Sequence, residues 1–84
     1  MDARTLQALV EAGAVRRVRI VADGAIFHVV AETGGGKVTA STRRGGIRTW
    51  RSLDAAAGWV HRLGIGALEV DLGRWQPGQR QLAI

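Results

Sequence analysis

A cluster of basic residues in the middle of the chain is the strongest candidate for binding chemistry. No acidic residue falls between Thr33 and Leu53. The basic residues of that stretch are Lys37, Arg43, Arg44, Arg48 and Arg51. Guanidinium groups make planar, bidentate contacts with phosphate and carboxylate groups, so the cluster predicts an anionic partner. The alternative interpretation is a solvated hairpin in an arginine-rich protein, and the residue types alone do not separate the two.

The cluster accounts for the whole net charge of the chain. Twelve Lys and Arg residues against seven Asp and Glu give +5, and five of the twelve lie in the cluster. The remaining seven basic residues balance the seven acidic ones. A localised excess of one sign favours a binding surface over a general contribution to solubility.

Residues capable of catalysis or metal binding are scarce. His28 and His61 are the only side chains that could act as bases near neutral pH, and they fall in different predicted elements. The chain has no cysteine, no histidine pair at helical spacing and no carboxylate cluster. We therefore expect no enzymatic activity, no metal and no cofactor.

Residues 33–39 resemble the end of a phosphate-binding loop only superficially. A true loop has glycine five residues before Gly36, where Ala31 stands, and Ser or Thr after the lysine, where Val38 stands. It also leads into a helix, whereas the pattern here continues as a strand. Nucleotide hydrolysis is not expected.

The first half of the chain reads as a short helix followed by a meander of strands. Asp2 or Thr5 can cap a helix over about residues 3–12, and Gly13 can end it. From Val15 the apolar pattern has period two, and Asp23-Gly24 predicts a tight turn. Three strands are predicted to follow, over residues 25–32, 37–42 and 47–50. The glycine-containing segments 33–36 and 43–46 connect them.

The second half reads as one helix and one strand. Ser52 can cap a helix that ends at Gly64, and its apolar stripe is Leu53, Ala56, Ala57, Val60 and Leu63. Residues 68–72 alternate as a last strand, which could return to the edge of the sheet. Of the tryptophans, Trp59 is expected in the core, and Trp50 is expected to fasten the helix to the sheet.

These elements predict an α+β fold. An antiparallel meander of three to four strands, plus a C-terminal edge strand, would be covered on one face by two helices. We expect a single domain over residues 1–74 and a tail over residues 75–84. No apolar run is long enough to span a membrane, and the start of the chain lacks the features of a signal peptide, so a cytoplasmic protein is expected.

Six short segments resemble a known family, the small ParC-type partition-associated proteins of plasmids and integrative elements. These segments are residues 6–9 (LQAL), 13–18 (GAVRRV), 43–56 (RRGGIRTWRSLDAA), 63–65 (LGI), 68–71 (LEVD) and 75–77 (WQP). The resemblance covers nearly the whole chain. It implies a role in maintaining or replicating a mobile element, through DNA or a partition or replication protein as partner, and it transfers no catalytic residue.

Two functions follow as hypotheses. The first is a DNA-binding accessory protein that uses a basic β-hairpin, in which arginines meet phosphates or guanine edges. The second is a protein-interaction module or homodimeric adaptor that acts through a sheet edge and the C-terminal tryptophan. The predicted interface residues of the second hypothesis are Leu68, Val70, Leu72 and Trp75.

Overall fold

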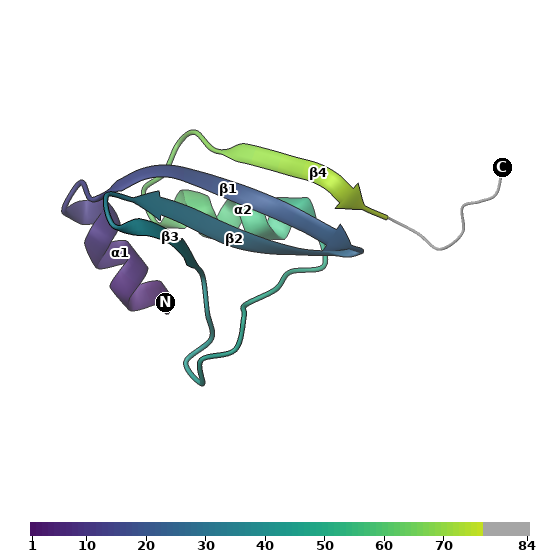
Figure 1. Cartoon of the computed structure of the whole chain (residues 1–84), viewed down its shortest axis with the longest axis horizontal. Helices are drawn as coiled ribbons and strands as arrows, with labels where there is room; N and C mark the ends of the chain where they lie inside the picture. Colours follow the sequence, from purple (N-terminus) through teal and green to yellow (C-terminus); the bar gives the residue numbers. More distant parts are fainter. Residues whose placement is uncertain (77–84) are drawn as a thin grey trace, which may run out of the picture.

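The computed structural model describes residues 1–76, in which a four-stranded sheet carries two helices on one face (Figure 1). The elements in chain order are α1 (Ala3–Glu11), β1 (Val15–Gly24), β2 (Ile26–Thr33), β3 (Gly36–Thr39), α2 (Leu53–Arg62) and β4 (Glu69–Trp75). The strand order across the sheet is β3-β2-β1-β4. The meander β1-β2-β3 is antiparallel, and β4 runs parallel to β1 at the edge. The α+β prediction is confirmed.

Both helices begin and end where local chemistry favours it. The Asp2 carboxylate accepts a hydrogen bond from the Thr5 N–H at 2.9 Å, so Asp2, and not Thr5, is the N-cap of α1. Ser52 caps α2 by accepting from the Ala55 N–H at 3.1 Å. Gly64 follows α2 with φ of 100°, a conformation that glycine adopts without steric cost.

The core lies between the helices and one face of β1 and β2. Residues that face each other across the two strands are buried together, as the pairs Ile20–Val29 and Ala22–Phe27 show. The helices complete this core with Leu6, Ala56, Trp59, Val60 and Leu63. The period-two pattern therefore identified the buried face correctly, because successive side chains of a strand point to opposite faces.

The predicted fourth strand over residues 47–50 is absent, and the third strand ends at Thr39 instead of residue 42. The segment makes only two isolated bridges, Ser41–Ile47 and Phe27–Trp50. A regular ribbon here would extend beyond the sheet, and residues 42–47, which would close it, are all exposed. Its one large aliphatic residue, Ile47, is 63% exposed, so no burial would stabilise the strand pairing.

The last strand is longer than predicted and includes Trp75, which the sequence analysis placed in the tail. The Gln76 N–H continues the pairing by donating to the Gly24 carbonyl at 2.7 Å. The rest of the predicted tail, residues 77–84, lies outside the described residues. Neither described helix has the length and apolar character needed to cross a membrane.

Candidate nucleic-acid interface

Residues 40–52 form an irregular connection between β3 and α2, which we call the basic loop. Figure 1 shows it as the long excursion at the bottom of the molecule. Its first arm is held by the Ala40 N–H, which donates to the Val29 carbonyl at 2.9 Å. Its second arm is held by two hydrogen bonds between Phe27 and Trp50, at 2.8 and 2.9 Å. Both ends of the loop are therefore anchored to β2, and the residues between them project from the sheet.

Arg48 is fixed by two tryptophans. Its guanidinium carbon lies 5.4 Å from the ring centroid of Trp50 and 5.4 Å from that of Trp59. The two rings contact each other at 5.0 Å with a tilt of 50°. A cation over an aromatic face is attracted by the negative charge of the ring face. Arg48 is consequently half-buried on the helix side of the sheet, with its guanidinium against two aromatic rings.

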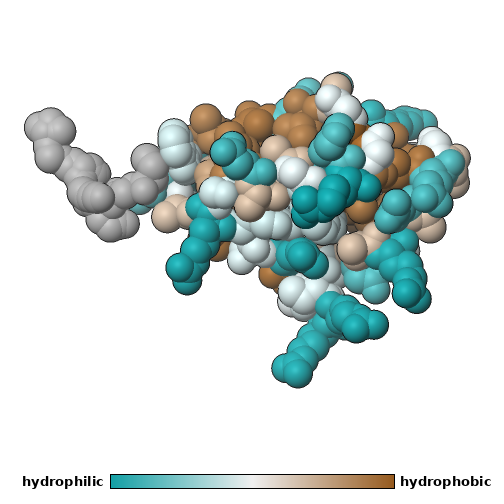
Figure 2. All heavy atoms as spheres, turned by 180° about the vertical axis from the view of Figure 1, so that it is seen from behind, coloured by the Kyte–Doolittle hydropathy of each residue, from teal (hydrophilic) through white to brown (hydrophobic). Residues whose placement is uncertain are grey.

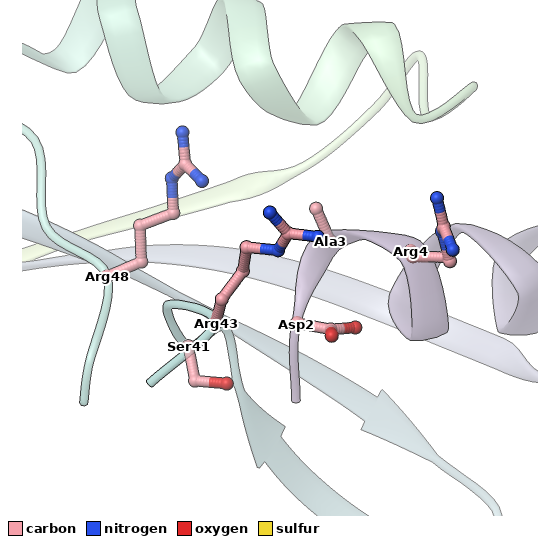
Figure 3. Close-up of a pocket in the computed structure, with 6 residues that line it drawn as sticks. All are labelled: Asp2, Ala3, Arg4, Ser41, Arg43 and Arg48. Carbon is pink, nitrogen blue, oxygen red and sulfur yellow. The ribbon is translucent and has the colours of Figure 1, made fainter. Parts of the chain in front are cut away.

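A hollow of about 390 Å³ lies between the basic loop and the start of α1 (Figure 3). Its lining residues are Asp2, Ala3, Arg4, Ser41, Arg43 and Arg48. In Figure 3 the guanidinium groups of Arg4, Arg43 and Arg48 project to the same side, while the Asp2 carboxylate points in another direction. Three cationic groups from two distant parts of the sequence therefore surround one opening.

Asp2 is the single acidic residue that lines the hollow, and its carboxylate already caps the N-terminus of α1. The hydrogen bond from the Thr5 backbone N–H holds the pKa of Asp2 below its ordinary value, so the group is ionised at neutral pH. Among the ion pairs within residues 1–76, none involves Asp2. With three arginines and one carboxylate, the hollow keeps a net positive charge and suits an anion such as a phosphate group.

The structure gathers some of the five predicted basic residues and separates others. Arg43 and Arg48 line the hollow, and Arg44 and Arg51 are exposed on the same loop. Lys37 lies apart, because it pairs in register with Glu32 on the sheet face that the helices leave open. The predicted two-stranded basic ribbon is wrong, and an irregular loop carries four of the five residues.

Arg4 is a member of the site that sequence analysis missed. It comes near the loop because the N-terminus runs beside the end of β3. The Met1 ammonium donates to the Thr39 carbonyl at 3.1 Å, and the Ser41 N–H donates to the Met1 carbonyl at 2.7 Å. These contacts join residues about 40 positions apart, so no local pattern could reveal them. The only available signal was the positive charge in the first turn of the helix.

Three arginines of the sheet, Arg17, Arg19 and Arg74, have acidic partners. On the open face, Arg19 donates to Glu69 at 3.0 Å and also faces Glu32 at 3.7 Å, while Arg74 pairs with Asp23 at 3.2 Å. The hydrogen bond to Glu69 raises the pKa of Arg19 further above its ordinary value. Within residues 1–76, no ion pair includes an arginine of the basic loop. In the described part of the chain, the basic loop therefore gathers four arginines that take part in no ion pair.

The two histidines lie on different sides of the sheet. His28 is half-buried on the open face opposite Val21, and His61 is exposed on α2. In the part of the chain that the structure describes, no three histidine, aspartate or glutamate side chains gather as a metal site would require.

The predicted interface residues divide into two groups. Val70, Leu72 and Trp75 are 40%, 43% and 42% exposed on β4, whereas Leu68 precedes the strand and packs against the core. Figure 2 shows hydrophobic residues along the upper border of the molecule, the border that β4 occupies in Figure 1. An apolar edge therefore lies across the sheet from the edge that leads into the basic loop.

Comparison with known proteins identifies the family of the chain. A family model described as ParC-like matches residues 1–79. Comparisons with curated proteins and with solved structures gave no match. The family match includes α1, the basic loop and β4, so both candidate surfaces lie inside it. Since this match spans 79 of the 84 residues, the chain belongs to the ParC-like family.

Proposed function

We propose that this protein is a non-enzymatic accessory factor in the maintenance of a plasmid or other mobile element, in partition or replication, and that it binds DNA. Membership of the ParC-like family supports the mobile-element context. The observation that carries the DNA-binding part is the hollow that Arg4, Arg43 and Arg48 line, with their guanidinium groups projecting to the same side.

The arrangement favours contact with the phosphate backbone. An irregular loop offers no regular ribbon for insertion into the major groove, so reading of base edges is not its primary mode. The hollow would hold one phosphate between guanidinium groups, and the exposed Arg44 and Arg51 would reach neighbouring phosphates. Because Arg48 is already ordered by Trp50 and Trp59, little side-chain entropy is lost when it binds.

The proposal is tested by fluorescence anisotropy with a generic DNA duplex across a series of salt concentrations. We expect a dissociation constant in the micromolar range or tighter at low salt. The affinity should fall steeply with salt, because each neutralised phosphate releases condensed counterions. Absence of binding at low salt, for a protein with net charge +5, would refute the proposal.

A matched pair of double variants locates the surface. The change R43A/R44A removes two exposed charges from the basic loop, and R16A/R17A removes two exposed charges at the start of β1. Both lower the net charge by two. We expect R43A/R44A to weaken binding by about tenfold or more and to flatten the salt slope, with a smaller effect of R16A/R17A. Equal effects would show that total charge, and not the loop, determines binding.

A second candidate function rests on the exposed apolar edge of β4. Val70, Leu72 and Trp75 lie on an edge strand that has a neighbour, β1, on one side only within the described residues. Such a strand can pair with another chain through its unpaired backbone groups. We therefore propose protein interaction through β4 as the alternative to DNA binding, and the two functions are compatible in one molecule.

A further inference from the structure

The two edges of the sheet differ in how open they are to pairing. At the β3 edge the strand has four residues, carries Lys37, and is followed by hydrogen bonds between Met1 and residues 39 and 41. The β4 edge has seven residues and lies at the border of the sheet, with no covering element among residues 1–76 (Figure 1). Natural edges are commonly blunted by short strands and lysines, as the β3 edge is. The β4 edge is longer and carries no lysine, and its charged residues are of both signs.

The residues of β4 are arranged on two faces around a bulge. The register with β1 shifts between Val21 and Asp23, so that Asp71 pairs with Val21 and Arg74 pairs with Asp23. Asp71 and Arg74 consequently share the open face, although they are three positions apart. Val70 and Trp75 pair with Ile20 and Gly24 and share the helix face.

We infer that β4 pairs in antiparallel fashion with β4 of a second copy of this chain, about a two-fold axis at the bulge. In this register Asp71 of each copy lies opposite Arg74 of the other, and Val70 lies opposite Trp75. Leu72 then faces Gly73, which has no side chain to obstruct it. The strand is thus complementary to itself in charge on one face and in apolar character on the other.

The charged groups remain available for these contacts. One oxygen of Asp71 accepts a hydrogen bond from the Gly73 N–H at 2.9 Å, which leaves its second oxygen for a guanidinium of the partner. The Arg74 side chain is 76% exposed in its pair with Asp23, and its five N–H donors can serve two carboxylates. Pairing would join two four-stranded sheets into one of eight strands, with the helices of both copies on the same face.

The inference rests on the second candidate function and is independent of DNA binding. The test is sedimentation equilibrium of the full chain without DNA. The wild type should show twice the mass of one 9.0 kDa chain. Asp71→Arg and Arg74→Asp should each place two like-charged pairs in the interface and weaken the dimer by roughly tenfold or more.

Mixing the two single variants gives the decisive result. One copy would carry arginine at both positions and the other aspartate at both, so a heterodimer would contain two opposite-charge pairs. We expect the equimolar mixture, and also the double variant D71R/R74D, to regain the two-chain mass. Glu11→Arg, with the same charge change as Asp71→Arg on exposed α1, should remain dimeric. Circular dichroism of each variant verifies that the fold is retained.

The outcomes are distinct from those of the DNA experiment. A wild type with the mass of one chain up to millimolar concentration overturns the self-pairing, as does a mixture that fails to associate when both single variants are folded. Since β4 lies at the opposite edge of the sheet from β3 and the basic loop, DNA anisotropy of the same variants reports the proposed DNA binding separately.

Discussion

At the scale of single residues, Arg48 links the stability of the fold to the candidate site. Its guanidinium packs over Trp59 of α2 and Trp50 at the end of the basic loop, and the same group lines the positively charged hollow. Arg44, four positions away, is exposed at the tip of the loop and lines no part of the hollow. The two arginines are therefore equivalent in charge and different in structural role.

Replacing Arg48 should cost stability, and replacing Arg44 should not. We expect Arg48→Ala to lower the free energy of unfolding by about 1 kcal/mol, since it removes a half-buried cation from two aromatic faces. Arg44→Ala should change the free energy of unfolding by less than about 0.5 kcal/mol, as is usual for exposed side chains. Urea denaturation followed by tryptophan fluorescence measures both variants. Equal stabilities would show that the tryptophan contacts contribute nothing.

At the scale of elements, α2 depends on its N-cap, Ser52. The Ser52 hydroxyl satisfies a backbone N–H that has no partner within the helix, and the helix supplies Ala56, Trp59 and Val60 to the core. Asp54 in the first turn adds a favourable charge near the helix N-terminus. The start of α2 also determines where the basic loop ends.

Removing the cap should weaken the whole domain. We expect Ser52→Ala to lower the free energy of unfolding by about 1 kcal/mol, which corresponds to roughly 4–8 °C in Tm for a domain of this size. Ser52→Asp should stay close to the wild type, because aspartate is an equally good N-cap. Thermal unfolding followed by circular dichroism measures both. A Ser52→Ala protein with unchanged Tm would contradict the role of the cap.

Features that depend on residues close together in the sequence were predictable, and features that depend on contacts between distant residues were not. The alternation in β1 and β2 identified the buried face because one side of each strand packs on the helices. The caps Asp2 and Ser52 act within three residues, so the local pattern identified Ser52 and offered Asp2 as one of two alternatives. The predicted strand over residues 47–50 is absent because residues 42–47, which would close the ribbon, gain no burial in the tertiary structure. Arg4 was missed because its position depends on hydrogen bonds of Met1 to residues 39 and 41.

At the scale of the whole molecule, charge is divided between two surfaces. Arginines of the open sheet face meet Glu32, Glu69 and Asp23, while those of the basic loop meet no acidic partner among the described residues. The paired arginines are exposed or half-exposed, and ion pairs of this kind contribute about 0–1 kcal/mol to stability. The fold therefore depends mainly on the apolar core, and salt should act mainly on ligand binding.

Salt should weaken DNA binding strongly and change the thermal stability of the fold only slightly. We expect the Tm to shift by no more than a few degrees between low salt and about 1 M NaCl, because the screened surface pairs contribute little. DNA affinity should fall by orders of magnitude over part of the same range. Differential scanning calorimetry and anisotropy on one sample provide the comparison. A large fall in Tm at high salt would show that ion pairs, and not apolar burial, support the fold.

The anchoring of the basic loop has a consequence for how the family can diversify. The chain leaves the edge of β2 at Ala40 and returns to the same edge at Trp50. Between these two points, residues 42–47 supply no buried side chain. Such a segment can tolerate insertions and substitutions, since its length and sequence can change while both anchors stay in place. Ligand preference in this fold can therefore evolve by loop replacement, without any compensating change in the core.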